Sequence, residues 1–244
     1  MAALGAVGGY ESKGMLGRGD DPAGAAHGVD ILFIATPDDQ VEQVASRVVP
    51  VESTVVVHLS GSLALGALAS HPRCGSLHPL VPLPTPELGA ERLRSGIAFA
   101  VAGDPITRML AVALGGSPVA VGDDRRVAYH AAATIAANHL VALIGQVERV
   151  AASAGLPLEA FAGLARAAID DAFALGPRRA LTGPAARGDW DTIEHHRGAL
   201  AGMAGHHTEM AAYDAMVGLA RRLSVDLSGA TAVGRSDADH EEVA

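Results

Sequence analysis

The chain has 244 residues, a formal net charge of −9 and 49% hydrophobic residues, enough to build one α/β domain with a smaller partner. A charged fraction of only 18% excludes a disordered or supercharged chain. The negative balance and an aromatic content of 3% argue against a nucleic-acid partner, which needs clustered cations and stacking rings. Cys74 is the only cysteine, which excludes an intrachain disulfide and fits a reducing cytoplasm.

The first half of the chain alternates strand-like and helix-like segments. Continuous apolar or β-branched runs predict strands over residues 31–35, 54–59, 74–78, 97–101 and 118–121. The intervening patterns predict helices over residues 40–49, 63–69 and 106–114. Apolar strands separated by helices are typical of a parallel sheet covered on both faces, so we expect an α/β domain over residues 1–121.

The second half of the chain changes character at Gly122. Helical patterns predict elements over residues 123–153, 157–175, 190–203 and 205–224, with a bend where glycine and proline cluster between 176 and 184. We therefore expect an all-α C-terminal domain over residues 122–227. The remaining tail, 228–244, is polar, acidic and without period, and is predicted to be disordered.

No segment reaches the ~18 uninterrupted apolar residues that a membrane-spanning helix needs. The longest apolar stretch, 129–147, is interrupted by two histidines, Thr134, Asn138 and Gln146. The sequence therefore predicts a soluble, cytoplasmic protein without a membrane partner.

The start of the chain lacks a feature of doubly wound dinucleotide-binding sheets, which open with a strand, a Gly-x-Gly-x-x-Gly loop and a helix. Residues 1–9 look like the end of an Ala/Gly-rich helix, and residues 14–17 look like a short strand in the second position. Residues 17–22 fail the motif because Pro22 replaces the third glycine. Since the first strand lies at the centre of such a sheet, we expect that about 20 residues upstream of Met1 carry it and the glycine loop.

Six short motifs occur in one order along the chain. They are IATPDD at 34–39, HLSGS at 58–62, GSLHPL at 75–80, YHAAA at 129–133, ANHLV at 137–141 and LTGPAARGD at 181–189. Over residues 15–223 the series resembles the Rossmann-like proteins with a C-terminal domain of unknown function, number 2520. These resemble pyrroline-5-carboxylate reductase, ketopantoate reductase and the 6-phosphogluconate dehydrogenase-like proteins. The resemblance implies an NAD(P)-binding Rossmann domain, a helical domain, and a reductase or dehydrogenase role.

Small residues follow two of the predicted strands, where open α/β sheets bind their ligands. We predict cofactor contacts from these residues, which are Ala35, Thr36, Pro37, Ser60 and Gly61. Arg18 follows the predicted second strand and could accommodate a 2′-phosphate, which favours NADP over NAD, although Asp20 could instead hold a ribose hydroxyl. Ordinary turn chemistry and a solvated arginine are the alternatives.

Three polar residues, His130, Thr134 and Asn138, are spaced i, i+4, i+8 and are expected along one face of the long helix. By resemblance, His130 and Asn138 are candidate catalytic residues that contact substrate or nicotinamide, and Thr134 is a candidate substrate ligand. His78 follows a predicted strand and could donate a proton to a carbonyl. The alternatives are a helix–helix hydrogen-bond network or dimer seam for the stripe, and a backbone-satisfied imidazole for His78.

A polar loop interrupts the predicted helical domain, and in it Thr182 and Arg187 are candidate substrate ligands, with Arg187 clamping a carboxylate. A capped turn with an Arg187–Asp189 pair is the alternative. No metal site is expected. The pairs His195-His196 and His206-His207 would lie ~16 Å apart on one continuous helix, and although a break at Gly202 and Gly205 would leave a site open, His206 and Glu209 lack a second matching pair. A nucleophilic role for the lone thiol would need an activating base that no motif supplies.

Together these features predict hydride transfer between a nicotinamide cofactor and a small carbonyl or imine compound. A non-catalytic dinucleotide-sensing or scaffold protein is the alternative from another class, and an inactive truncated fragment is a third. A homodimer through the helical domain is also expected.

Overall fold

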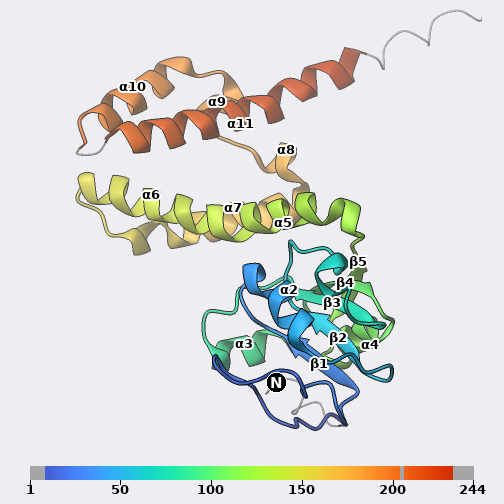
Figure 1. The fold of residues 1–244 in the computed structure, drawn as a ribbon. Helices are drawn as coiled ribbons and strands as arrows, with labels where there is room; N and C mark the ends of the chain where they lie inside the picture. Colours follow the sequence, from blue (N-terminus) through green and yellow to red (C-terminus); the bar gives the residue numbers. More distant parts are fainter. Residues whose placement is uncertain (1–8, 204–205, 233–244) are drawn as a thin grey trace, which may run out of the picture. The chain divides into compact units, whose positions relative to one another are not determined.

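The computed structural model describes residues 9–203 and 206–232. One compact unit ends at Leu140 and a second begins at Val141, and each is described by itself (Figure 1). The boundary that the sequence places after residue 121 stays a prediction.

The first unit contains a five-stranded sheet whose strands match the five predicted ones. Their order across the sheet is β1-β2-β3-β4-β5. The strands are β1 (Ile31–Ile34), β2 (Val55–His58), β3 (Cys74–Pro79), β4 (Ala98–Gly103) and β5 (Ser117–Ala120). The helical segments between them are α2 (Asp38–Arg47), the 3₁₀ turn η1 (Leu65–Leu68), α3 (Pro86–Arg92) and α4 (Ile106–Ala113).

Helix α3 was not predicted, although its start carries a recognisable signal. The Thr85 hydroxyl accepts a hydrogen bond from the Leu88 N–H, and Pro86 occupies the first helical position.

The strands are not all parallel, which corrects one part of the prediction. β1 pairs with β2, β2 with β3, and β4 with β5 in parallel, but β3 and β4 are antiparallel. The segment that contains α3 returns the chain to the edge of the sheet where β3 ends, so that Pro79 pairs with Phe99 at the start of β4. Only β1, β2 and β3 therefore have their carboxyl ends at a common edge.

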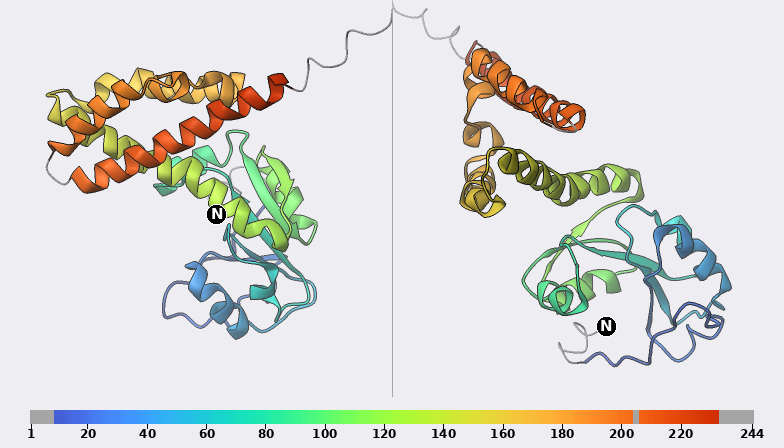
Figure 2. Two further views of the ribbon diagram at one scale, coloured as in Figure 1. Left: turned by 90° about the horizontal axis from the view of Figure 1, so that it is seen from above. Right: turned by 90° about the vertical axis from the view of Figure 1, so that its left-hand side faces the viewer.

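The central strands β2, β3 and β4 are largely buried on both faces, as the continuous apolar strands predicted, whereas the edge strand β5 is mostly exposed. Val55 and Val57 of β2 pack with residues of β3, β4 and α4 in one cluster, whereas Val56 packs with Ile34, α2 and η1 in another. Figure 2 shows α2 and α4 on opposite sides of the sheet. The alternation along each strand thus fixes which side chains reach which layer.

The segment before β1 differs from the prediction. Residues 14–17 form no strand; Met15 and Leu16 are 83% and 57% exposed, and Gly14 has a φ of +136°. A strand needs a second strand to pair with, and no described strand pairs with this segment, whose Gly17 instead closes a turn with Asp20. The helix expected over residues 1–9 lies almost wholly outside the described residues.

One continuous helix spans Asp123–Ser153, as predicted. It comprises the 3₁₀ turn η2 (Asp123–Arg125), α5 (Arg126–Thr134), a π-helical turn η3 (Ile135–His139) and α6 (Leu140–Ser153). By length and composition alone it could cross a membrane, although one such helix is weak evidence by itself.

The second unit consists of helices. After α6 these are η4 (Leu158–Phe161), α7 (Ala162–Leu175), the one-turn α8 (Pro177–Ala180) and α9 (Pro184–Arg187), α10 (Trp190–Ala201) and α11 (His206–Ala232). Glu209 of α11 is buried and forms an ion pair with Arg149 of α6. Arg197 of α10 pairs with Asp214 of α11 at 2.8 Å. These ion pairs link α11 to two other helices of the unit.

Helix α11 continues beyond the predicted end of the domain. Residues 228–232, predicted as part of a disordered tail, are helical, because this Ala-containing stretch holds no proline and only Gly229 weakens it. The rest of that tail, 233–244, lies outside the described residues.

Gly103, at the end of β4, is a position where we expect substitution to destabilise the fold. Its φ is +77°, and an added Cβ would lie 2.3 Å from the Cys74 carbonyl oxygen. Gly28 has a similar φ of +70° but no atom within 4 Å of such a Cβ. Gly103→Ala should therefore lower the free energy of unfolding by roughly 2 kcal/mol more than Gly28→Ala, measured by urea denaturation. Equal effects of the two substitutions would contradict this close approach.

Candidate functional site

The carboxyl ends of the three parallel strands bring candidate residues to one edge of the sheet. Thr36 lies just after β1, Ser60 and Gly61 just after β2, and His78 near the end of β3. The Thr36 hydroxyl oxygen is buried without a hydrogen-bond partner. A buried donor at a strand end is a ready contact for a polar ligand group.

A serine–aspartate network shapes the turn after β2. The Ser60 and Ser62 hydroxyls each donate to the Asp38 carboxylate at 2.7 Å, and Ser60 Oγ accepts from the N–H groups of Ser62 and Leu63. Partial burial raises the pKa of Asp38, but the two serine hydrogen bonds outweigh it and hold the pKa below its usual value. The turn is therefore fixed to the start of α2 by an ionised carboxylate.

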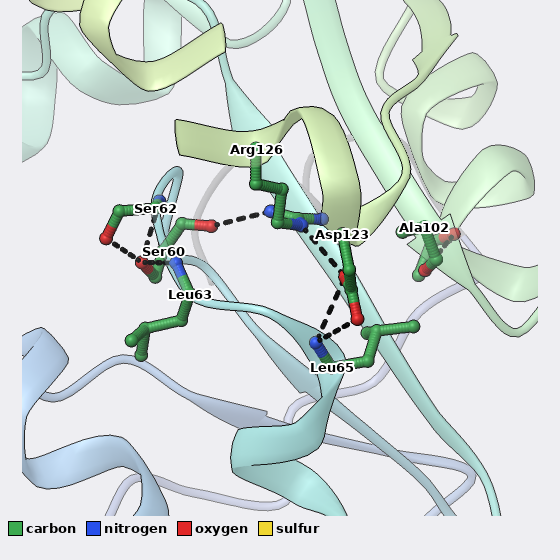
Figure 3. Close-up of polar contacts among 8 residues, drawn as sticks. Ser60, Ser62, Leu63, Leu65, Ala102, Asp123 and Arg126 are labelled. Atoms are coloured by element: carbon green, nitrogen blue, oxygen red, sulfur yellow. Dashed lines mark hydrogen bonds and ion pairs between the residues drawn. The ribbon is translucent and has the colours of Figure 1, made fainter. Parts of the chain in front are cut away.

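Arg126, at the start of α5, is fully buried on the other side of this turn. Figure 3 shows its guanidinium between the Ser60 carbonyl oxygen, which accepts from Nη1 at 3.3 Å, and the Asp123 carboxylate, 3.5 Å from Nε. Asp123 also accepts from the Leu65 N–H at 3.1 Å. Burial lowers the pKa of Arg126, yet a guanidinium stays protonated, so a positive charge is held against the turn.

His58, the last residue of β2, is also fully buried, and neither of its ring nitrogens has a hydrogen-bond partner. Burial, and next the charge of Arg126, lower its pKa from 6.5 to about 4. The imidazole is therefore neutral near pH 7.

His78 and Tyr129 form a hydrogen-bonded pair at the same edge. The Tyr129 hydroxyl lies 2.5 Å from His78 Nδ1, and the rings are nearly perpendicular. Burial raises the pKa of Tyr129 to about 12, and burial together with His130 lowers the pKa of His78. We assign the phenol as donor, because it is the stronger acid of the two neutral groups. His78 Nε2 then carries the ring proton.

Gly61 is the point at which two candidate histidines meet. An added Cβ would lie 2.9 Å from His78 Nε2 and 2.8 Å from His130 Cδ2. The two imidazoles approach edge to face, with ring centroids 6.2 Å apart. The structure thus brings His78, His130 and Gly61 together, and the space beside this glycine is taken by imidazole rings; the expected approach of a cofactor there stays a prediction.

The predicted polar stripe of the long helix is interrupted. His130 and Thr134 are half-buried in α5, whereas Asn138 is exposed and lies within the π-helical turn. This wider turn breaks the α-helical spacing from which we expected all three residues on one face. The contact of Asn138 with a substrate stays a prediction.

Of the remaining candidates, Ala35 and Pro37 flank Thr36 at the strand ends, whereas Arg18, Thr182 and Arg187 lie elsewhere in the chain. Arg18 is exposed in a turn closed by the Asp20 carboxylate, and the strand expected to position it is not formed. Ala35 and Pro37 are exposed between β1 and α2. Thr182 and Arg187 line a pocket within the second unit.

Sequence reasoning missed three residues that the structure places at the strand ends: His58, Arg126 and Tyr129. Tyr129 stands beside His130 in the YHAAA motif, which was a usable signal for a second polar group on that helix. A histidine that ends a fully apolar strand, and an arginine that opens an apolar helix, were signals for buried polar groups.

The family model described as "Domain of unknown function (DUF2520)" matches residues 97–219. No curated protein matches the chain significantly. A solved Thermotoga maritima protein is 28% identical, with a TM-score of 0.67 over 80% of this chain and 78% of that one.

Two further solved structures share the fold. A candidate NADP oxidoreductase of Bacteroides fragilis is 17% identical, with a TM-score of 0.66 over 79% of this chain and 75% of that one. Pyrroline carboxylate reductase of Plasmodium falciparum, solved with NADP bound, is 11% identical, with a TM-score of 0.53 over 91% and 92%. The sheet followed by helices is therefore a Rossmann-type architecture shared with reductases.

Proposed function

This chain belongs to the family defined by the domain of unknown function DUF2520, and we propose that it is an NADP-dependent oxidoreductase acting on a small carbonyl or imine compound. The observation that carries the proposal is the His78–Tyr129 pair, held at the edge where three parallel strands end. This is where open α/β sheets bind ligands, and a protonated phenol joined to a neutral imidazole is suited to proton donation.

The described residues fit the nicotinamide end of the cofactor. Thr36 has a buried hydroxyl without a partner, and with Ala35, Pro37, Ser60 and Gly61 it would hold this end. The described residues contain no Gly-x-Gly-x-x-Gly loop that would hold the pyrophosphate. NADP is favoured over NAD because the fold is shared with a reductase solved with NADP bound, and Arg18 is proposed for its 2′-phosphate.

In this proposal, NADPH supplies the hydride when bound, and the protein supplies the proton. His78 Nε2–H donates to the substrate oxygen or nitrogen, and His78 Nδ1 takes up the Tyr129 hydroxyl proton. The charge of Arg126 lowers the pKa of Tyr129, opposing the effect of burial, and so stabilises the tyrosinate until solvent returns the proton. His130 and Asn138 orient the substrate, with Thr134 as a further contact; Thr182 and Arg187 are proposed substrate ligands.

The proposal is tested by cofactor binding and turnover. We expect NADPH to raise the Tm of the full chain more than NADH does, and Thr36→Val to reduce that rise, because the variant lacks the unpartnered hydroxyl. Loss of NADPH absorbance should follow addition of at least one compound from a panel of small aldehydes, ketones and cyclic imines. No Tm shift with either cofactor and no oxidation would refute the proposal.

A second candidate function is a non-catalytic dinucleotide sensor or scaffold, which the exposed position of Asn138, a predicted substrate contact, favours. This function predicts that NADPH raises the Tm of the protein, while no compound in the panel causes oxidation of NADPH. The two functions are separated by the same pair of measurements.

We also propose a cytoplasmic homodimer that associates through the helical unit. Phe173 and Leu164 of α7 are 89% and 70% exposed, and large apolar side chains so exposed are common at subunit interfaces. A single free cysteine is compatible with a reducing compartment.

A further inference from the structure

The helical unit contains a pocket of its own. It has a volume of about 300 Å³, at the lower end of the range for small-molecule sites. Three segments supply its wall: α8, the stretch from α8 to the end of α9, and α11, against which both short helices pack. The lining residues are Arg178, Leu181, Thr182, Ala186, Arg187 and Ser224.

The pocket is lined by positive charge without a matching negative charge. Two guanidiniums, from Arg178 and Arg187, contribute to its wall, and no carboxylate does. Neither arginine forms an ion pair within the described ranges, whereas Arg197 in the same unit is paired with Glu194 and Asp214. Two unneutralised cations at one small pocket favour an anionic ligand.

The nearest candidate for neutralising Arg187 is already engaged. The Asp189 carboxylate accepts hydrogen bonds from the Thr192 N–H and hydroxyl and caps the start of α10. These bonds, more than the charge of Arg187, lower the pKa of Asp189. The direct Arg187–Asp189 pair considered as an alternative from the sequence is not formed, which leaves the guanidinium available.

The hydroxyl groups complete the lining. Thr182 is exposed and can donate to a ligand oxygen, while the Ser224 hydroxyl already donates to the Arg221 carbonyl oxygen and forms part of the wall. Leu181 and Ala186 supply a short apolar surface beside the charges. This combination matches a compact ligand with an anionic head.

We propose that this pocket binds a compact oxyanion carrying two negative charges, a phosphate group or a small dicarboxylate, clasped by Arg178 and Arg187. Guanidiniums bind both groups through paired N–H donors, and two of them match a dianion better than a monoanion. All six lining residues belong to the second unit. The proposal extends the substrate-ligand role proposed above for Thr182 and Arg187, but anion binding at this pocket can be measured without the reduction.

Isothermal titration of the full chain with inorganic phosphate, succinate and acetate, at constant ionic strength, tests this proposal. We expect saturable binding of phosphate or succinate, and the stronger of the two identifies the ligand class. Arg178→Gln or Arg187→Gln should each weaken binding about tenfold or more, from the loss of one charge-assisted contact. Acetate should bind far more weakly than the stronger dianion.

Arg179→Gln provides the matched control, because Arg179 belongs to the same short helix but does not line the pocket. It should leave the affinity unchanged, and Thr182→Val should weaken binding without changing helical content by circular dichroism. Binding that is absent, equal for acetate, or equally weakened by Arg179→Gln and Arg187→Gln would overturn the proposal.

Discussion

Replacing Tyr129 with phenylalanine should lower kcat for NADPH-dependent reduction by about 100-fold or more, the usual scale for removing a general acid–base group. The variant keeps the ring but loses the hydroxyl that lies 2.5 Å from His78 Nδ1. In the variant, no hydroxyl can transfer a proton to His78 Nδ1 when His78 gives up its Nε2 proton to the substrate. Steady-state NADPH oxidation with the best substrate of the panel measures the effect. The pH profile of kcat in the variant should lack the part that the His78–Tyr129 pair contributes in the unmodified protein.

The helical unit supplies a matched control. Tyr213 makes the same kind of contact, with its hydroxyl 2.7 Å from His196 Nδ1 and ring centroids 5.8 Å apart. Tyr213→Phe should therefore leave kcat and its pH profile unchanged. Equal losses in the two variants, or an unchanged kcat in Tyr129→Phe, would remove Tyr129 from the mechanism.

Acidification should destabilise the protein through His58. Burial, with a smaller contribution from Arg126, lowers its pKa from 6.5 to about 4. Below pH 6.5 the His58 imidazole binds a proton in the unfolded chain but not in the folded chain. The free energy of unfolding therefore decreases as the pH is lowered, until the pH reaches the pKa of His58 in the folded protein, about 4. Between pH 7 and pH 4 this one residue should account for a loss of about 3 kcal/mol.

Urea denaturation across this pH range measures the loss. His58→Leu should show a shallower decline in stability than the unmodified chain, while carboxylates such as Asp38, whose pKa is also lowered, still contribute to the decline in both proteins. His27 is exposed, so His27→Leu should leave the slope unchanged. Identical slopes for His58→Leu and the unmodified chain would show that the His58 imidazole titrates normally.

The strands and most helices could be predicted because their signals are local. A run of β-branched residues such as Val55–Val57 favours a buried strand. Pro157 precedes the start of one helix and Gly176 ends another, and both signals act locally, whatever the helix packs against. The antiparallel direction of β4 could not be predicted, because it depends on where the connection through α3 leads. The expected strand at residues 14–17 failed because strand formation needs a partner that the local pattern cannot supply.

The site was predicted in part for the same reason. Strand ends identify Thr36, Ser60 and His78 from sequence alone, since ligand edges follow from parallel topology. The hydrogen bond between His78 and Tyr129 joins residues 51 positions apart, and the burial of Arg126 depends on its contact with Ser60, 66 positions away. The π-helical turn at Ile135–His139 likewise has no signature that distinguishes it from the α-helical turns around it.

The close approach of two imidazoles to Gly61 has a consequence for comparing related sequences. Any side chain at this position would displace the ring of His78, of His130, or of both. Relatives that carry a larger residue where this chain has Gly61 should therefore lack at least one of these histidines. Such covariation would separate family members that use His78 and His130 from those that use another acid, and it can be read from sequences alone.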